Sequence, residues 1–281
     1  MIRPLLPADV PAARDVQWAA LSELDVRLGQ TTPELTPEIR ARGEGRIAHL
    51  QHTDPESAWV AEINGTVVGC GLALVREGMW FLSLLMVDPA YQGRGGGREL
   101  LDATLGTATD RSWILATSDP AALRRYQRAG FDLHATYTAK GTVKAGLLPK
   151  GLGVSEGSYA EHADLVEDIS RSLRGATLRP DLAFYEQTGA SLLVVPGAGY
   201  AVVRGDALVT LAATNEDAAR RLLWAYFAQA TGPVEVDWLA AGQQWAIDVC
   251  LDAHLGLEAG ASICLRGQPP MPTYLPGGAF G

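Results

Sequence analysis

The sequence has 281 residues, of which 47% are hydrophobic and 20% are charged, a composition typical of globular proteins and unlike disordered or collagen-like chains. At about 100–200 residues per domain, this length predicts two domains. The net charge of −9 divides unevenly, into −1 for residues 1–150 and −8 for residues 151–281. A nucleic-acid-binding chain would carry a basic face, so no nucleic acid is expected as a partner.

Several other classes of protein are excluded by motifs that the sequence lacks. No stretch reaches the roughly 18 apolar residues that cross a bilayer, and the N-terminus lacks the apolar run of a signal peptide. We therefore expect no membrane association and a cytoplasmic location. The three cysteines form no C-x-x-C pair, and the five histidines form no H-x-x-x-H or H-E-x-x-H pair, so no metal site is expected. Neither G-x-S-x-G nor a Walker sequence occurs, which argues against serine-hydrolase and P-loop chemistry.

The hydrophobic periodicity and the turn residues predict an alternation of helices and strands. In chain order, the first half is expected to contain helices over 8–24 and 34–51, strands over 58–63, 66–75 and 79–87, a helix over 98–105, a strand over 113–117, a helix from Asp119 to Gly130 and a strand over 131–142. The second half is expected to contain a helix over 160–173, strands over 191–195, 200–204 and 207–214, a helix over 216–229, a strand over 234–240, a helix over 245–255 and a strand over 258–265. Each half is thus an α/β layer structure.

The two halves share this order from the third strand onward. A constant offset of 126 residues places Leu85 on Leu211, Gly106 on Gly232 and Gly130 on Gly256. We interpret the chain as a tandem duplication of one domain.

A glycine-rich segment lies between the third predicted strand and the next helix. Four of the five residues from Gly93 to Gly97 are glycine. Glycine lets the backbone approach a ligand closely, and the N–H groups of such a loop and of a helix N-terminus bind phosphate oxygens. The dinucleotide motif G-x-G-x-x-G is not met, because Arg98 or Leu100 stands where the third glycine belongs. The segment therefore predicts a pyrophosphate site that does not belong to a dinucleotide fold.

Two motifs carry a resemblance to a known family. The run Gln92-Gly-Arg-Gly-Gly-Gly97 matches Q/R-x-x-G-x-G/A and follows Val87-Asp-Pro89, and residues 122–131 match A-x-x-x-Y-x-x-x-G-F. Their order resembles the GNAT (Gcn5-related N-acetyltransferase) superfamily over about residues 1–145. The whole chain resembles the tandem GNAT proteins of bacteria, which include mycothiol synthase-like enzymes.

This resemblance implies two tandem GNAT-like domains, each a mixed, mostly antiparallel sheet flanked by helices. An acetyl-CoA-binding domain would span residues 1–146, and a degenerate GNAT-like domain with a C-terminal tail would span residues 147–281. The implied activity is acetyl-CoA-dependent N-acetyl transfer, made directly to an amine of a small molecule or peptide by a monomer or homodimer without a metal.

The resemblance also implies roles for individual residues. Leu85, Met86 and Val87 would pair with the pantetheine arm, and a backbone N–H near Leu85 would stabilise the developing oxyanion. The coenzyme A pyrophosphate would be bound by six loop residues, namely Gln92, Gly93, Arg94, Gly95, Gly97 and Arg98. Tyr126 would protonate the departing thiolate, or alternatively only pack. Asp119 stands where the family often has Asn, so its pantetheine contact is left open beside a helix N-cap role.

The second half fails the same tests. The offset puts Ala218–Leu223 where the glycine loop should be, directly after Glu216 and Asp217, and it puts Asp252 in place of Tyr126. Two carboxylates there would repel a pyrophosphate. We therefore predict that the C-terminal half does not bind acetyl-CoA.

Two questions stay open at the level of sequence. Residues 79–87 contain no acidic side chain, so the amine proton leaves through water or through a weaker candidate, of which Glu62, Glu77, His52 and Ser83 are four. Without a base, the chain could instead be a non-catalytic acyl-CoA-binding or regulatory module. The Pro/Gly-rich tail, residues 269–281, is expected to dock through Tyr274 and Phe280 near the N-terminal domain rather than fray.

Overall fold

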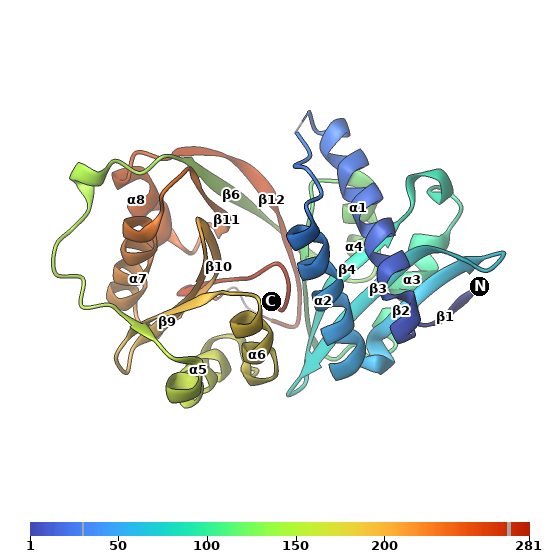
Figure 1. Ribbon diagram of the computed structural model, residues 1–281, viewed down its shortest axis with the longest axis horizontal. Coiled ribbons are helices and arrows are strands. Elements are labelled where there is room, and N and C mark those ends of the chain that lie inside the picture. Colours follow the sequence, from blue (N-terminus) through green and yellow to red (C-terminus); the bar gives the residue numbers. More distant parts are fainter. Residues whose placement is uncertain (30, 269–270) are drawn as a thin grey trace. The chain divides into compact units, whose positions relative to one another are not determined.

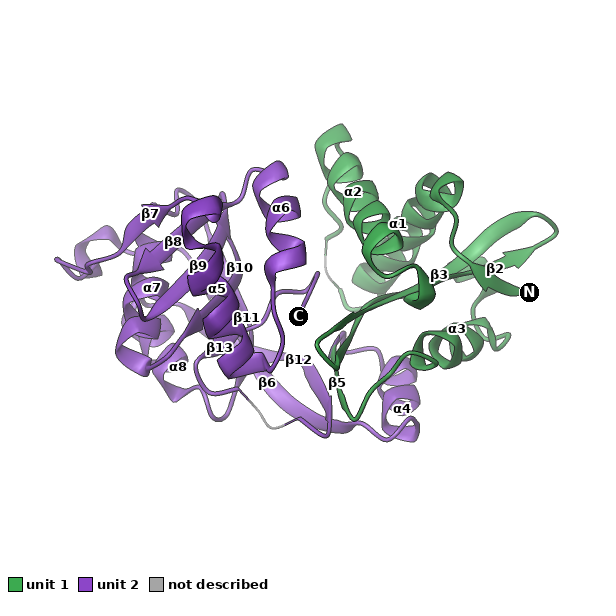
Figure 2. Cartoon of the chain, turned by 90° about the horizontal axis from the view of Figure 1, so that it is seen from below, with its two compact units in different colours: residues 1–114 green, residues 115–281 purple. Residues whose placement is uncertain are grey.

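The computed structural model describes residues 1–29, 31–268 and 271–281. The chain divides into two compact units, residues 1–114 and 115–281, which Figure 2 shows in different colours. This division follows the density of contacts within each unit. The boundary between sequence repeats at residues 146 and 147 stays a prediction.

The first unit is a five-stranded sheet with helices on both faces (Figure 1). Its elements are β1 (Ile2–Pro4), α1 (Val10–Arg27), α2 (Pro37–Thr53), β2 (Ala58–Ile63), β3 (Thr66–Arg76), β4 (Met79–Val87), α3 (Gly96–Leu105) and the start of β5 (Arg111–Ala116). The strand order is β1-β2-β3-β4-β5. The pair of β4 with β5 is parallel, and the other pairs are antiparallel. All the predicted elements of this segment are present, and the three-residue β1 was not predicted.

Side chains along a strand alternate between the two faces of a sheet, so neighbouring residues of β3 contact helices on opposite faces. Cys70 Sγ lies 3.8 Å from the Ala13 carbonyl of α1. On the opposite face, a Cβ placed on Gly69 would lie 2.9 Å from Leu100 Cδ1, and one placed on Gly71 would lie 3.1 Å from a methyl of Thr104. These two glycines let α3 approach the sheet closely. This close contact holds α3, which begins where the glycine segment ends, against the sheet.

The second unit repeats the alternation of helices and strands and adds short elements that the sequence did not predict. It contains α4 (Pro120–Arg128), β6 (Asp132–Gly141), β7 (Ser155–Gly157), α5 (Tyr159–Arg174), α6 (Arg179–Gln187), β8 (Ser191–Val195), β9 (Gly199–Arg204), β10 (Ala207–Ala213), α7 (Glu216–Gln229), β11 (Val234–Ala240), α8 (Gln244–Asp252), β12 (Gly256–Arg266) and β13 (Tyr274–Leu275). The strand order is β12-β6-β11-β10-β9-β8-β7, and β13 pairs with β10. The unpredicted elements are β7, α6 and β13.

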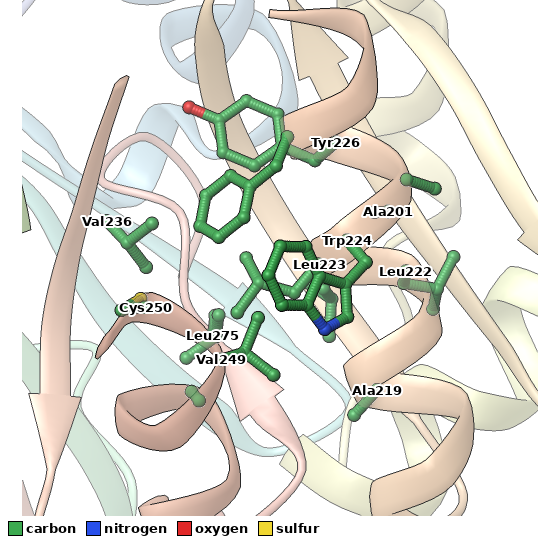
Figure 3. Packing of buried hydrophobic residues seen from close by; sticks show 14 of the residues in the cluster. Ala201, Ala219, Leu222, Leu223, Trp224, Tyr226, Val236, Val249, Cys250 and Leu275 are labelled. Atoms are coloured by element: carbon green, nitrogen blue, oxygen red, sulfur yellow. The ribbon is translucent and has the colours of Figure 1, made fainter. Parts of the chain in front are cut away.

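The core of the second unit lies where α7 and α8 pack against the sheet (Figure 3). Leu222 and Leu223 of α7 are fully buried, as is Cys250 of α8. Within the described ranges, no helix of either unit combines the length and the apolar character that crossing a bilayer requires.

Candidate functional site

The strand β4 is paired on both edges at its start and on one edge at its end. Its pairs with β5 run from Met79–Arg111 to Leu82–Ile114, and no later β4–β5 pair occurs among the described residues. On the other edge, its pairs with β3 continue to Val87 opposite Gly69. The last residues of β4 therefore have one ladder edge without a strand partner, which we call the open edge of β4.

Leu85 presents its backbone to this open edge. The Asp88 amide donates to the Val68 carbonyl at 2.9 Å, so residue 88 points toward β3. Because directions alternate in an antiparallel ladder, Met86 also points its N–H and C=O toward β3, and Leu85 points them away. The Gln92 side chain agrees with this alternation of backbone directions. Its amide nitrogen donates at 2.9 Å to the carbonyl of Val87, another residue whose backbone faces away from β3.

The loop after β4 is held by its own side chains. The Asp88 carboxylate accepts from the Ala90 amide at 2.8 Å and starts the turn. The Arg94 guanidinium donates to the Ala90 carbonyl at 3.2 Å and lies 5.4 Å from the centre of the Tyr91 ring. Gln92 and Arg94, both predicted phosphate ligands, thus also shape the loop.

The glycines are required for two different reasons. Gly93 and Gly95 have φ values of 78° and 95°, in the left-handed region that favours glycine. Gly96 has no positive φ, and no heavy atom lies within 4 Å of the place where its Cβ would be. Neither strain nor crowding inside the unit explains that glycine. The open space leaves room for a ligand to approach the backbone at Gly96, which the predicted contacts did not include.

The loop ends at the N-terminus of α3, a position where free N–H groups can bind an anion. The first N–H groups of a helix have no intrahelical acceptor and carry partial positive charge. Arg94 and Arg98 are exposed beside them, and Arg98 lies 3.5 Å from the equally exposed Asp102. Backbone N–H groups, a helix N-terminus, Arg94 of the loop and Arg98 of the first turn of α3 can bind a group with several anionic oxygens.

Two of the predicted site residues, Asp119 and Tyr126, lie in the second unit. The Asp119 side chain accepts from the Ala121 amide at 3.1 Å and caps α4, which confirms its N-cap role. Tyr126 is 6% exposed. Burial raises the pKa of its phenol well above the usual value, with a smaller contribution from Cys264. The hydroxyl therefore keeps its proton at neutral pH.

The four candidates for a general base lie in different surroundings. Glu62 on β2 binds the Arg3 guanidinium at 2.7 Å. Glu77 stands in the turn between β3 and β4 with a φ of 47°, and His52 is exposed in the last turn of α2. Ser83 alone lies on β4, where it is buried. No carboxylate or imidazole from this set is placed on β4 beside Leu85.

The corresponding strand of the second unit, β10, has its edge covered. Its pairing with β11 is the single pair Ala207–Glu235, so these two strands also diverge. Beyond that point β13 pairs with β10, Leu275 opposite Leu211 and Tyr274 opposite Ala212. The Thr210 hydroxyl adds a hydrogen bond of 2.9 Å to the Leu275 carbonyl. Leu211, the counterpart of Leu85, therefore has a partner from the tail of the same chain.

The tail continues into the core of the second unit. Phe280 is fully buried, and its ring centre lies 5.2 Å from Phe184 and 5.4 Å from Tyr185. Pro269 and Pro270, where the predicted tail begins, lie outside the described residues. The expected docking through Tyr274 and Phe280 is thus confirmed, with the contacts made inside the second unit. A position of the tail near the N-terminal domain stays a prediction.

The second unit also has no phosphate loop after its strand. Only Thr214 and Asn215 separate β10 from α7, and the Asn215 side chain caps the helix by accepting from the Ala218 amide at 2.9 Å. In the first unit, residues 88–95 separate β4 from α3. The positions aligned with the glycine run are therefore helical in α7, and Glu216 and Asp217 occupy its first turn.

The comparisons with known proteins agree with this geometry. Residues 19–131 match the model of the acetyltransferase (GNAT) family, and no curated protein matches the sequence significantly. Among solved structures, a provisionally assigned acetyltransferase from Pyrococcus horikoshii shares 18% identity at a TM-score of 0.79, covering 100% of this chain and 95% of that one. A tandem GNAT protein from the clavulanic acid biosynthesis pathway shares 16% identity at a TM-score of 0.58, covering 96% and 99%.

A third structure, a GCN5-related N-acetyltransferase from Kribbella flavida, shares 15% identity at a TM-score of 0.60, covering 94% of this chain and 71% of that one. Identities this low show a common fold. Among the described residues, no group of three or more His, Cys, Asp or Glu could hold a metal ion. The chain carries an acetyltransferase domain of the GNAT family within residues 19–131, and over its whole length it has the fold of tandem GNAT proteins.

Proposed function

We propose that this protein transfers an acetyl group from acetyl-CoA directly to an amine of a small molecule or peptide. The observation that carries the proposal is the open edge of β4 at Leu85, which leads directly into the glycine loop and the N-terminus of α3. An acyl-CoA has two features that match these in order. Its pantetheine arm carries amides that can pair with a strand, and its pyrophosphate is an anion with several oxygens.

Different residues of the first unit would bind different parts of the coenzyme. The N–H groups of Gly93, Gly95 and Gly97 would hold the pyrophosphate, and Gln92, Arg94 and Arg98 would flank it. The backbone of Leu85, Met86 and Val87 would pair with the pantetheine arm. The Leu85 N–H would donate to the thioester oxygen and stabilise the charge that develops there as the amine attacks.

The proposed reaction needs one proton donor from the protein. The amine nitrogen forms a bond to the thioester carbon, the carbon–sulfur bond breaks, and the departing sulfur takes a proton from the Tyr126 hydroxyl. Burial keeps this phenol protonated, which a proton donor needs. Water would carry the proton that the amine loses back to the Tyr126 phenolate, because β4 offers no carboxylate. Asp119 would contribute through its cap of α4, which bears Tyr126.

A second candidate function, a non-catalytic acyl-CoA-binding or regulatory module, is favoured by one observation. The candidates for a base are paired, exposed or remote from Leu85, as in the ion pair of Glu62 with Arg3. Such a module would bind acetyl-CoA through the same loop without turnover.

An assay of coenzyme A release over a panel of amines separates the two candidates, with Gly95→Glu as the variant expected to bind the coenzyme only weakly. Release by the wild type with at least one amine, absent in Gly95→Glu, supports the transferase. If acetyl-CoA binds to the wild type and no amine in the panel releases coenzyme A, the module becomes the better description. Failure of the wild type to bind acetyl-CoA would contradict both.

A further inference from the structure

The ladder between β3 and β4 contains an irregularity next to the open edge. Leu72 pairs with Leu84, but its neighbour Ala73 pairs with Leu82. Ser83 is therefore an extra residue on β4, a β-bulge, and it is 9% exposed. A bulged residue is left without a regular ladder partner, and a buried backbone carbonyl needs a donor from elsewhere.

Arg46, on the middle of α2, provides that donor. Its Nη2 donates to the Ser83 carbonyl oxygen and, at 2.7 Å, to the Ser83 hydroxyl, which also accepts from Nε at 3.1 Å. One planar guanidinium thus binds both the backbone and the side chain of the bulged residue. Burial raises the pKa of the Cys70 thiol on the neighbouring strand to about 12, and the Arg46 charge opposes that rise by a smaller amount.

The bulge determines which amides of β4 face the open edge. In a strand, a shift of one residue reverses the direction of every following side chain and peptide group. If Ser83 were absorbed into a regular ladder, Leu85 would turn its N–H toward β3. Its side chain, which packs with Leu100 and Val68 on the α3 face, would turn to the other face of the sheet.

We propose that Arg46 is a positioning residue for acyl transfer, which acts by holding the Ser83 bulge so that the Leu85 N–H faces the open edge. This inference rests on the proposed function. No sequence pattern indicated it, because Arg46 and Ser83 are 37 residues apart and belong to no motif.

The first test does not depend on turnover. Amide hydrogen exchange, resolved by NMR for Leu84, Leu85 and Met86, reports which of the three amides faces the ladder. In the wild type, we expect Leu85 to exchange fastest and the two neighbours to be protected. In Arg46→Met, the contrast between Leu85 and its neighbours should be lost or reversed, whereas Arg42→Met, an exposed arginine one turn earlier on α2, should keep it. An unchanged contrast in Arg46→Met would overturn the proposal.

The second test is kinetic. Because one oxyanion donor contributes roughly 100-fold or more to kcat, Arg46→Met should lower kcat by about that factor while the KM for acetyl-CoA changes by less than about threefold. Arg46→Lys should recover part of the loss, since an ammonium replaces the charge but not the planar fork. A rise in KM with unchanged kcat would contradict the proposal, because Arg46 would then contribute to binding.

These outcomes are distinguishable from failure of the proposed function. If the wild type releases no coenzyme A with any amine, the proposed reaction is wrong. The exchange contrast at Leu85 still decides whether Arg46 sets the orientation of β4.

Discussion

Each unit contains a pair of strands that diverge. The strand edge that this divergence exposes is open in the first unit and covered in the second. In the first unit, β4 leaves β5 after Leu82 and its edge stays open beside a glycine loop. In the second unit, β10 leaves β11 after Ala207, and β13 pairs with the edge. An exposed strand edge attracts a partner strand. In the second unit, a segment of the same chain satisfies the backbone groups that stay open in the first.

The short connection before α7 and the strand β13 both distinguish the second unit from the first in this comparison. A connection of two residues between β10 and α7 leaves no backbone free to surround a phosphate, and Asn215 occupies the helix N-terminus. A pantetheine arm without a pyrophosphate site would bind weakly. The covered edge therefore supports the prediction that the second half does not bind acetyl-CoA.

Removal of the tail should have the largest effect on stability. Truncation after Thr273 deletes Tyr274, Leu275 and Phe280, all of which are 2% exposed or less. Each large buried side chain contributes about 3–5 kcal/mol, so we expect a loss on the order of 5 kcal/mol or more in the free energy of unfolding, measured with urea. Calorimetry should still find one acetyl-CoA per chain. A second equivalent would mean that the tail alone prevents binding at β10.

Substitution of a loop glycine should have the next largest effect. Gly95→Glu places a β-carbon at a φ of 95° and a carboxylate at the phosphate site, so acetyl-CoA affinity should fall about 1,000-fold, or roughly 4 kcal/mol. The matched control is Gly205→Glu in the second unit, whose φ is 55° and whose Cβ would have no heavy atom within 4 Å, against one at 3.9 Å for Gly95. Equal losses in the two variants would show that backbone strain, rather than the site, governs binding.

Removal of the predicted acid should lower turnover without lowering affinity. Tyr126→Phe should reduce kcat by about 100-fold, the lower end of the range for general acids, and leave the acetyl-CoA dissociation constant nearly unchanged. Because burial raises the pKa of Tyr126, wild-type kcat should show no alkaline loss from this group below about pH 10. Tyr137→Phe, at a tyrosine that is 48% exposed, serves as the control. Normal kcat in Tyr126→Phe would leave this side chain a packing role.

Alkaline pH should lower the stability of the second unit more than that of the first. This is the smallest of the expected effects. Burial raises the pKa of five tyrosines there, namely Tyr126, Tyr159, Tyr185, Tyr200 and Tyr226, whereas the first unit contains only Tyr91. The unfolded phenols ionise near pH 10 and the buried ones later. The stabilisation is therefore complete below about pH 10 and declines as the pH rises toward the folded-state values.

Urea unfolding followed from pH 8 to pH 11, with hydrogen exchange to resolve the two units, checks this expectation. Tyr185 offers a sharp variant, because its hydroxyl has no hydrogen-bond partner among the described residues. Tyr185→Phe should reduce the alkaline loss without a penalty at neutral pH, whereas the exposed Tyr137→Phe should not change it. Equal alkaline losses in the two units would be the contrary result.

Local signals in the sequence predicted those parts of the fold that short-range chemistry determines. The Asn64-Gly65 pair forms the expected hairpin turn, with φ values of 50° and 79°. Gly130 follows α4 with a φ of 85°, and Asp119 caps the same helix. The glycine loop lies between β4 and α3 as predicted. In each case neighbouring residues determine the backbone conformation, because few alternatives satisfy the same hydrogen bonds.

Short elements were missed because their own residues do not determine them. The strands β1, β7 and β13 have three, three and two residues, too few for a period to be read. They are strands because β2, β8 and β10 pair with them. The helix that begins at residue 216 was predicted, and the 126-residue offset already aligned it with the glycine loop of the first half.

The sequence by itself determined the GNAT resemblance, the glycine loop and the repeat, since each depends on residue types at fixed spacing. Only the tertiary structure decided which face and which edge each group occupies. The bulge at Ser83 sets the direction of the Leu85 N–H, Arg46 reaches it from another helix, and β13 covers the equivalent edge of β10. Register and edge pairing join residues that are far apart in the chain. A one-residue shift of register, which the composition does not reveal, reverses the face and the edge that each residue occupies.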